Sequence, residues 1–232
     1  MRFEQRSYTK ELLDADDIPF ADIRQNMLEL NTINTWLGGH SITRKGFKKL
    51  ASGKKEIIVC EIGCGGGDNL AAIVRWSQSN NILITCIGID WKESCIEVAR
   101  ENPLFTAKDQ WIVSDYAAVS FDRKPDIIFS SLFCHHFTEE QLLFQLAWMR
   151  DNSLLGFFIN DLHRHWLAHD SIALLTSWFS SSYLVKHDAP LSVARGFVKK
   201  EWQQLCWKAG IRNPAISWQW AFRHLIIYQH AE

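Results

Sequence analysis

The sequence lacks a strong charge of either sign, a low-complexity composition and a long hydrophobic run. Its 25 lysine and arginine residues are balanced by 26 aspartate and glutamate residues, so no overall charge draws it to a nucleic acid or an anionic membrane. Only 5 proline and 12 glycine residues occur among 232, which excludes collagen-like and disordered chains. Because 47% of the residues are hydrophobic, we expect one sizeable globular domain with an appendage.

Cysteine is present, but not in a pattern that binds zinc or forms disulfides. The six cysteines include no C-x-x-C pair, and a chain of this length needs no disulfide, which favours buried free thiols in a reducing cytosol. No stretch approaches the roughly 18 apolar residues of a membrane-spanning helix. Residues 1–6 mix acid with base and lack the apolar core of a signal peptide. We therefore expect a cytoplasmic protein without stable membrane insertion.

Short apolar runs alternate with helix-length segments from residue 56 onward. Buried strands are expected at 57–62, 82–89, 111–113, 126–130 and 154–159, with helices between them at 69–76, 93–100 and 139–150. This alternation predicts an α/β fold with an open, mainly parallel, doubly wound sheet. Further helices are expected at 166–179 and 199–208, and strands at 215–220 and 224–228. Since a short turn joins the last two strands, they should form an antiparallel hairpin.

The two ends of the chain differ in character from its middle. Apolar residues three or four positions apart, from Ile23 to Leu37, predict a helix that Gly38 and Gly39 end. We interpret residues 1–50 as an N-terminal helical cap or lid and 51–232 as the main domain. The polar stretch at about 180–198 reads as a lid-like insertion. Six of the 11 tryptophans lie in the last third; we expect core packing for most of them and contact with an aromatic substrate for one or two.

A glycine-rich loop follows the first strand, in the segment Glu61-Ile62-Gly63-Cys64-Gly65-Gly66-Gly67-Asp68. Alternate glycines let the backbone turn sharply and let a ligand approach the main-chain N–H groups. The dinucleotide fingerprint is G-x-G-x-x-G, whereas this loop reads G-x-G-x-G. Asp68 would repel a pyrophosphate where the helix opens, but it would suit a ligand with a cationic end.

Acids follow the next two strands. Asp90 ends the second strand and is placed to accept hydrogen bonds from ribose hydroxyls, with Trp91 beside it to stack on a purine; capping the following helix is its plainer role. Asp115 follows the third strand and either accepts from an exocyclic amine or caps a turn.

These residues resemble the class I S-adenosylmethionine-dependent methyltransferases. The family has an acid and G-x-G-x-G after strand one and an acid after each of strands two and three, positions filled here by Glu61, Gly63, Gly65, Gly67, Asp90 and Asp115. The resemblance covers about residues 56–232. It implies a Rossmann-like sheet of seven strands with a reversed C-terminal hairpin, and S-adenosyl-L-methionine as cofactor. The cofactor-binding candidates are Glu61, Gly63, Cys64, Gly65, Gly67, Asp90, Trp91, Asp115, Tyr116 and Ser131.

The segment after the fourth strand narrows the resemblance. It reads Ser130-Ser131-Leu132-Phe133-Cys134-His135-His136-Phe137, without the Asn/Asp-Pro-Pro-aromatic motif typical of members that methylate nucleobase or amide nitrogens. The histidine pair is similar to small-molecule methyltransferases of the quinone-biosynthesis type. This similarity implies a small acceptor and argues against a nucleic acid.

Candidate catalytic residues must lie at the carboxyl ends of the strands, where open α/β sheets bind their ligands. A neutral imidazole can accept a phenolic proton, and Asp161 can orient it. The catalytic candidates are His135, His163 and Asp161, and the substrate-binding candidates are His136, Arg164, Arg195 and Arg223. We expect Arg223 to pair with an acid. We predict no metal site, because His163, His165 and His169 would have to converge across a strained strand-to-helix junction.

The leading hypothesis is a methyltransferase acting on a small apolar, aromatic or phenolic metabolite, at oxygen rather than carbon, with a histidine as general base. An NAD(P)-dependent oxidoreductase and a non-catalytic cofactor-binding partner subunit are the alternatives. The sequence predicts neither the acceptor nor the oligomeric state.

Overall fold

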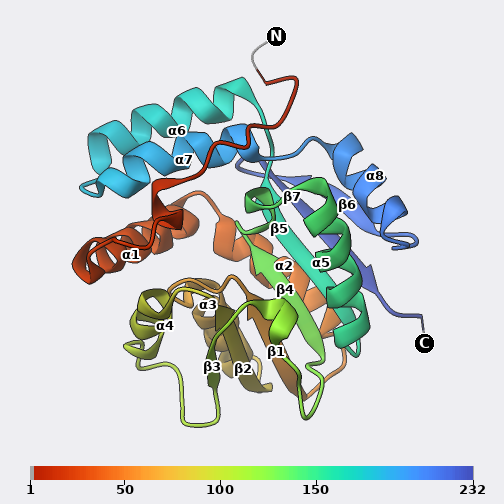
Figure 1. Ribbon diagram of the computed structural model, residues 1–232. Helices are drawn as coiled ribbons and strands as arrows, with labels where there is room; N and C mark the ends of the chain where they lie inside the picture. Colours follow the sequence, from red (N-terminus) through yellow and green to blue (C-terminus); the bar gives the residue numbers. More distant parts are fainter. Residues whose placement is uncertain (1–2, 232) are drawn as a thin grey trace.

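The computed structural model describes residues 3–231, in which seven strands form one sheet (Figure 1). The strands are β1 (Glu56–Ile62), β2 (Leu83–Asp90), β3 (Gln110–Val113), β4 (Ile127–Ser131), β5 (Gly156–Leu162), β6 (Ala215–Gln219) and β7 (Arg223–Gln229). Their order is β3-β2-β1-β4-β5-β7-β6. The first five are parallel, and β7 runs antiparallel to both β5 and β6. The predicted doubly wound sheet with a C-terminal hairpin is confirmed.

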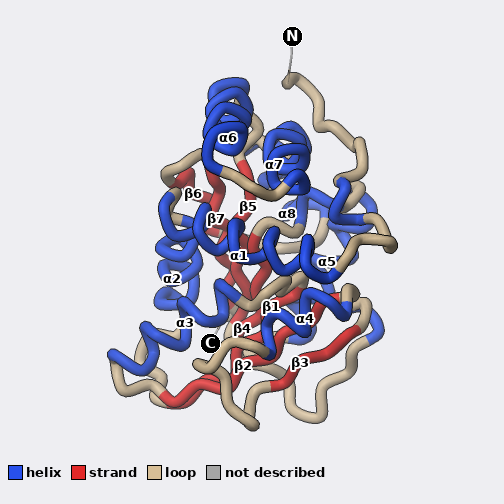
Figure 2. The backbone as a smooth tube through the Cα atoms, turned by 90° about the vertical axis from the view of Figure 1, so that its left-hand side faces the viewer, coloured by secondary structure: helices blue, strands red, loops and turns tan. Residues whose placement is uncertain are grey.

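Helices cover both faces of the sheet and its carboxyl edge. The α-helices are α1 (Phe20–Trp36), α2 (Gly39–Leu50), α3 (Asp68–Ser79), α4 (Glu93–Arg100), α5 (Glu139–Asn152), α6 (Trp166–Phe179), α7 (Tyr183–Arg195) and α8 (Lys199–Lys208). Short 3-10 helices are η1 (Leu12–Asp14), η2 (Tyr116–Ala118) and η3 (Cys134–His136). One face carries α2, α3 and α4, and the other carries α5 and α8. Figure 2 shows α6 and α7 side by side, with α1 close to α7.

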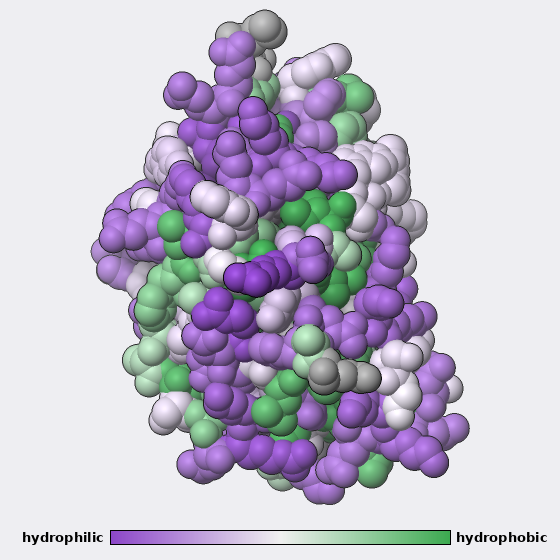
Figure 3. Space-filling view, turned by 90° about the vertical axis from the view of Figure 1, so that its right-hand side faces the viewer, coloured by the Kyte–Doolittle hydropathy of each residue, from purple (hydrophilic) through white to green (hydrophobic). Residues whose placement is uncertain are grey.

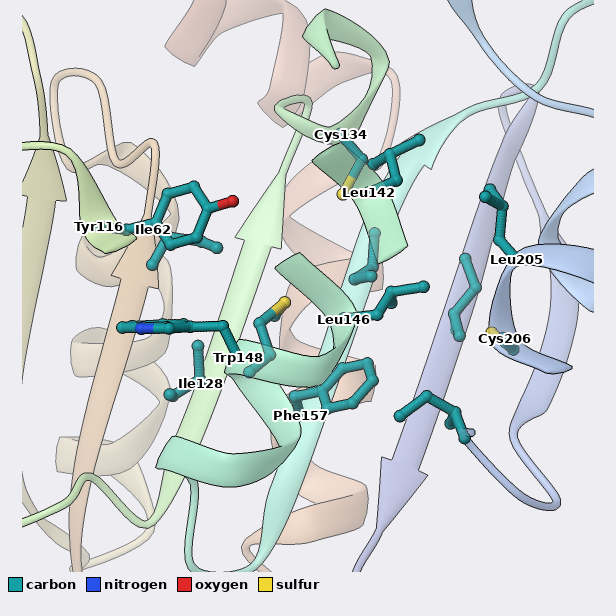
Figure 4. Close-up of a cluster of buried hydrophobic side chains, with 14 of the residues drawn as sticks. Ile62, Tyr116, Ile128, Cys134, Leu142, Leu146, Trp148, Phe157, Leu205 and Cys206 are labelled. Carbon is teal, nitrogen blue, oxygen red and sulfur yellow. The ribbon is translucent and has the colours of Figure 1, made fainter. Parts of the chain in front are cut away.

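The pleat of β1 explains the two layers. Ile57 and Val59 point into the cluster beneath α2 and α3, whereas Cys60 and Ile62 point into the cluster beneath α5. Successive side chains of a strand face opposite sides of the sheet, so a strand buried on both faces reads as a continuous apolar run. Figure 4 shows the second cluster, in which Trp148 of α5 lies close to Ile128 of β4, with its ring centroid 5.2 Å from that of Tyr116.

The N-terminal region has two structural parts. Helix α1 ends at Trp36, and Gly38 takes a left-handed φ of 79° before α2 begins at Gly39, as the glycine pair predicts. Helix α2 packs directly on the sheet, where Phe47 is fully buried. Helix α1 instead contacts α4 and α7. Residues 1 and 2 of the predicted 1–50 segment lie outside the described residues.

Two expectations for the C-terminal third are wrong. The polar stretch at 180–198 is mostly the helix α7 rather than a loop, with Pro190 inside it, while the lid-like role of this segment stays a prediction. Core packing of the late tryptophans holds only for Trp202, which is fully buried. The other five are exposed because they lie on the outer sides of helices or in the hairpin that ends the sheet; they are Trp166, Trp178, Trp207, Trp218 and Trp220.

Other surface and composition expectations agree with the structure. All six cysteines are buried free thiols. Hydrophilic residues cover most of the face seen in Figure 3, interrupted by small hydrophobic clusters. Among the described residues, no helix combines the length and the apolar character needed to cross a membrane.

Candidate functional site

A cavity of about 470 Å³ lies at the carboxyl ends of β1, β2 and β4. All the predicted cofactor residues except Gly67 line it, namely Glu61, Gly63, Cys64, Gly65, Asp90, Trp91, Asp115, Tyr116 and Ser131. Its opposite wall comes from α1 and the preceding segment, through residues such as Met27 and Asn34. Parallel strands present their carboxyl ends at one edge, which brings loops distant in sequence together there.

The glycine loop has a conformation that requires glycine. Gly63 has φ +65°, and a Cβ atom there would lie 2.2 Å from the Phe133 ring. Gly67 has φ +73°, and its Cβ would lie 2.9 Å from the Trp111 ring. A left-handed φ disfavours a residue with a Cβ atom. Gly67 precedes α3 rather than lining the cavity, so its role is to shape the loop.

Asp90 ties the glycine loop to the end of β2. One carboxylate oxygen accepts a hydrogen bond from Gly65 N–H at 2.9 Å, and the other accepts from Lys92 N–H at 3.0 Å. Burial raises the pKa of Asp90. A carboxylate has about four lone-pair positions, so oxygens that accept one bond each retain capacity for a ligand's hydroxyl groups. Asp115 lies at the cavity wall and accepts from Ala117 N–H at 2.9 Å, which caps η2.

Asp68, the first residue of α3, lies at the cavity wall in a network of polar side chains. It accepts from Asn34 Nδ2 at 2.8 Å, and its Oδ2 lies 2.7 Å from His40 Nε2. Burial alone would raise the pKa of Asp68, but His40 and Asn34 hold it below its ordinary value. Nearby, burial and the charges of Asp68 and Asp90 raise the pKa of Glu61 well above its ordinary value. The Asp68 carboxylate therefore supplies negative charge at the cavity wall, as the sequence indicates, whereas the raised pKa of Glu61 favours its neutral form.

A second cavity of about 270 Å³ adjoins the first. Leu13, Leu30, Leu132 and His136 line both cavities. The remaining wall is mostly apolar and comes from α1, α6, α7 and the β6–β7 hairpin. Trp220 is the one late tryptophan among its lining residues. The polar lining includes Glu11, His135, His136 and Arg223.

The predicted pair of His135 and Asp161 forms in the structure. His135 Nδ1 lies 2.8 Å from Asp161 Oδ1, and both side chains are almost fully buried. On its other side, His135 Nε2 lies 3.4 Å from Glu11 Oε1. Burial alone would lower the pKa of His135, but the carboxylates of Asp161 and Glu11 raise it to about 9. Asp161 itself lines neither cavity, so it acts through His135.

The neighbouring His136 faces both cavities. Its Nε2 lies 3.7 Å from Glu11 Oε2, and its Nδ1 lies 3.3 Å from Asp14 Oδ1. Its side chain is about one fifth exposed, in contrast to that of His135. Glu11, His135 and His136 each offer an atom, all within 4.8 Å of one another, that could bind a metal ion. The N-terminal acids therefore bring a possible metal-binding group to a place where the sequence predicts none.

The three predicted substrate arginines occupy different environments. Arg223 lines the second cavity, donates to Asn34 Oδ1 at 2.8 Å and has no hydrogen-bond partner for Nη1. Its expected pairing with an acid is wrong, because the amide of Asn34 takes that place. Burial lowers the pKa of Arg223 to about 10. Arg195 lines neither cavity; it donates to the carbonyls of Thr9 and His135 and lies 4.0 Å from Glu11.

Arg164 does not fit the predicted role in substrate binding. It makes a two-pronged ion pair with Glu201, at 2.9 and 2.8 Å. It also donates to the carbonyls of Phe3, Glu4 and Gly196, so every N–H of its guanidinium is engaged. Arg164 instead ties the N-terminal segment to the start of α8.

His163 does not reach either cavity. It accepts a hydrogen bond from Trp218 Nε1 at 3.1 Å, and its ring lies beside that of His224. Half-burial lowers its pKa. Leu162 turns toward the second cavity, and the alternation of side chains along β5 sends His163 elsewhere. Its predicted catalytic role therefore finds no support in this geometry.

Sequence reasoning missed the residues that the N-terminal segment brings to the site. Glu11 and Asp14 lie more than 100 positions before the histidines that they face. Asn34 and His40 likewise reach Asp68 from α1 and α2. The available signal was the acidic character of residues 11–22 beside an apolar helix. This acidic character does not identify the residues that the acids contact, because those contacts form only in the folded chain.

Comparisons with known proteins agree with this architecture. Residues 59–152 match the family model described as a methyltransferase domain. A 57-residue segment is 37% identical to the tRNA N(3)-methylcytidine methyltransferase trm140 of Schizosaccharomyces pombe, covering 25% of this chain and 17% of that protein. The chain thus spans about one sixth of the curated relative it matches.

Solved structures resemble nearly the whole chain. The plantazolicin methyltransferase BpumL, in complex with SAH, has a TM-score of 0.67 at 18% identity, covering 91% of this chain and 90% of that one. Human N-acetylserotonin methyltransferase, in complex with SAM, has a TM-score of 0.64 at 13% identity, covering 92% of this chain and 57% of that one. The chain thus has a Rossmann-like fold like that of these methyltransferase structures, and its residues 59–152 match a methyltransferase domain.

Proposed function

We propose that this protein is a methyltransferase that uses S-adenosyl-L-methionine to methylate an oxygen of a small, mostly apolar acceptor, aromatic or phenolic in kind. The observation that carries this proposal is the pair of adjoining cavities, one bordered by the glycine loop and acidic side chains and one largely apolar, with Leu13, Leu30, Leu132 and His136 in both linings. A group-transfer enzyme needs its two substrates to meet at one point with their remaining parts apart.

The first cavity suits the cofactor. Asp90 retains acceptor capacity for two ribose hydroxyls, and Asp115 is placed at the wall for the adenine amine. The carboxylate of Asp68 gives the methionyl ammonium an opposite charge. The same carboxylate disfavours the pyrophosphate of NAD(P) at the helix start. The oxidoreductase alternative is thereby weakened, and a nicotinamide fluorescence titration would test it.

The second cavity suits the acceptor. Its volume of about 270 Å³ fits a single ring system with substituents. Arg223 lines this cavity, and its positive charge favours an acceptor with a phenolic or carboxylate oxygen. His135 and His136 lie in the same lining, and His136 also borders the cofactor cavity. The acceptor's reacting oxygen therefore belongs beside the histidine pair.

The chemistry is an in-line displacement. The acceptor oxygen donates an electron pair to the methyl carbon, the carbon–sulfur bond breaks, and its electrons neutralise the sulfonium. Enclosure by α1, α6 and α7 holds the reactants at close range and excludes water. The hydroxyl proton leaves at the polar end of the cavity. His135, held by Asp161, accepts a proton only in its neutral form, which its raised pKa of about 9 restricts to alkaline pH.

Several finer expectations belong to this proposal. They are the likeness to the quinone-biosynthesis group, the cytoplasmic location, and the role of the residues before β1 as a cover over both cavities. A tRNA acceptor is the competing substrate class, because trm140 is named as a tRNA N(3)-methylcytidine methyltransferase. The apolar lining of the second cavity and its volume of about 270 Å³ favour a small molecule.

The test uses the full chain and two matched variants. Ala168 of α6 is buried and lines the second cavity, whereas Leu174 of the same helix is exposed and lines neither cavity. Ala168→Phe should abolish methylation of a phenol and quinol panel while leaving S-adenosylhomocysteine binding unchanged, and Leu174→Phe should alter neither. Equal activity in the two variants would refute this location for the acceptor.

The alternatives give different results in the same assay. Cofactor binding with no transfer to any phenol, quinol or tRNA would favour the non-catalytic partner subunit. Transfer to tRNA alone would replace the small-molecule acceptor. Failure of the full chain to bind S-adenosylhomocysteine would remove the proposal altogether.

A further inference from the structure

Three side chains at the polar end of the second cavity are spaced as metal ligands, and Ser192 Oγ donates to one of them, Glu11 Oε1, at 2.7 Å. Glu11 presents Oε1 to His135 Nε2 at 3.4 Å and Oε2 to His136 Nε2 at 3.7 Å. Both distances exceed the usual range of an N–H···O hydrogen bond, about 2.7–3.2 Å. They approach the edge of a zinc tetrahedron, about 3.3 Å for metal–ligand bonds of about 2.0–2.2 Å.

Outer carboxylates orient both histidines. Asp161 faces His135 Nδ1 at 2.8 Å, and Asp14 faces His136 Nδ1 at 3.3 Å. In a metal-bound state the Nδ1 proton of each histidine would face its outer carboxylate and Nε2 would face the metal and Glu11. Metal binding would therefore displace the Nε2 proton that a pKa of about 9 keeps on His135. Metal-binding histidines almost always have such a carboxylate or carbonyl partner on the second ring nitrogen. The same arrangement occurs twice here, on histidines adjacent in sequence.

We propose that Glu11, His135 and His136 bind one divalent transition-metal ion, of the kind that Zn²⁺ or Co²⁺ represents. Two imidazoles and one carboxylate are a ligand set for such ions. All three residues line the second cavity, so the fourth position opens toward the acceptor. A site with three protein ligands and one open position is typical of catalytic metals.

The side chains around the site carry the negative charge that a divalent cation needs. Glu11, Asp14 and Asp161 contribute carboxylates, and Arg195 is the cation nearest to Glu11 among the ion pairs found in the described residues. The Arg195 guanidinium lies 4.0 Å from Glu11 and donates to the carbonyls of Thr9 and His135. Its hydrogen bonds go to backbone carbonyls and not to the three ligand atoms, although its charge weakens the affinity for a cation.

The role of the metal rests on the proposed function. The bound ion would coordinate the acceptor's hydroxyl oxygen and release its proton to water, because a divalent metal acidifies an oxygen that it binds. The oxygen then attacks the methyl carbon while the carbon–sulfur bond breaks toward sulfur. The products are a methyl ether, a proton and S-adenosylhomocysteine, and no oxidant or reductant is needed.

Metal binding can be measured without any assay of activity. The full chain is stripped with a chelator, dialysed and titrated with Co²⁺, and the visible absorption of bound Co²⁺ is recorded. We expect saturation at one ion per chain and displacement by Zn²⁺. The variant His136→Gln removes a ligand on a partly exposed side chain and should weaken binding by at least about tenfold.

A second variant separates this site from adventitious histidine binding. Asp14 is not one of the proposed ligands, yet Asp14→Asn should weaken Co²⁺ binding by about tenfold. Loss of a carboxylate that orients a ligand histidine typically lowers metal affinity 10–100-fold. His165→Gln is the control, because His165 belongs to a different histidine pair with His163, and it should leave binding unchanged. Absence of a saturable Co²⁺ signal, or an unaltered signal in His136→Gln, would overturn the proposal.

Failure of the metal site and failure of the proposed function give different results. If metal-stripped protein binds S-adenosylhomocysteine and methylates a phenol at the full rate, the metal proposal is wrong and the function stands. If Co²⁺ binds as expected but S-adenosylhomocysteine does not, the metal site stands and the function is wrong. The account as a whole expects unchanged cofactor affinity and a methylation rate that falls at least about tenfold until metal is restored.

Discussion

The Asp90→Ala variant tests how the cofactor is held. The Asp90 carboxylate fixes the glycine loop through Gly65 N–H at 2.9 Å and the start of α4 through Lys92 N–H at 3.0 Å. Hydrogen bonds to a charged group contribute about 1.5–3 kcal/mol each. Alanine would release both loop contacts and also remove the acceptors proposed for the ribose hydroxyls.

The expected loss of affinity follows from these contacts. If the proposed ribose bonds together contribute about 3 kcal/mol to binding, the dissociation constant for S-adenosylhomocysteine rises by about 100-fold. Isothermal titration calorimetry measures this change, with circular dichroism to show that the variant is folded. Asp115→Ala is the companion variant, with an expected loss of about tenfold because its carboxylate is more exposed. An unchanged affinity in folded Asp90→Ala would refute the assignment of the first cavity to the cofactor.

Three further predictions concern stability. Gly63→Ala should destabilise the protein by about 1–3 kcal/mol and weaken cofactor binding, because the left-handed turn would carry a Cβ against Phe133; chemical denaturation and calorimetry measure the two effects. Arg164→Gln should cost about 3 kcal/mol by leaving Glu201 unpaired, and a loss under 1 kcal/mol in urea unfolding would contradict that structural role. Burial lowers the pKa of His224 to about 4, below its ordinary value of 6.5, so the unfolded chain binds the proton first and stability falls as the pH drops from about 6.5 to 4. His224→Leu should remove this part of the decline in melting temperature, and parallel curves for the two proteins would count against it.

The sheet and most helix boundaries follow from local sequence patterns. Helix α4 begins and ends at Glu93 and Arg100, as predicted, because its apolar stripe is flanked by polar residues. The glycine loop was recognisable because its backbone conformation restricts residue choice at Gly63 and Gly67. In both cases the determining interactions are local or follow from the pleat of a strand.

The sequence predictions that fail share a physical cause. Each concerns a side chain whose contacts are with residues distant in the sequence. Glu11 meets His135 only because Arg6 and neighbouring residues anchor the N-terminal segment across the strand ends, where Arg6 donates to the His135 carbonyl. Arg164 is predicted to bind substrate because the sequence does not reveal its ion pair with Glu201, which lies on a separate element. The polar composition of residues 180–198 predicts an insertion, although the fold forms the helix α7 there and accommodates Pro190 within it.

A crystal structure with S-adenosylhomocysteine tests the central claim most directly. The account predicts the adenosyl group in the first cavity, with its ribose on Asp90, and the sulfur directed at the junction lined by Leu132 and His136. The second cavity would then open directly from the sulfur. A cofactor bound elsewhere, or a sulfur directed away from the second cavity, would contradict the account.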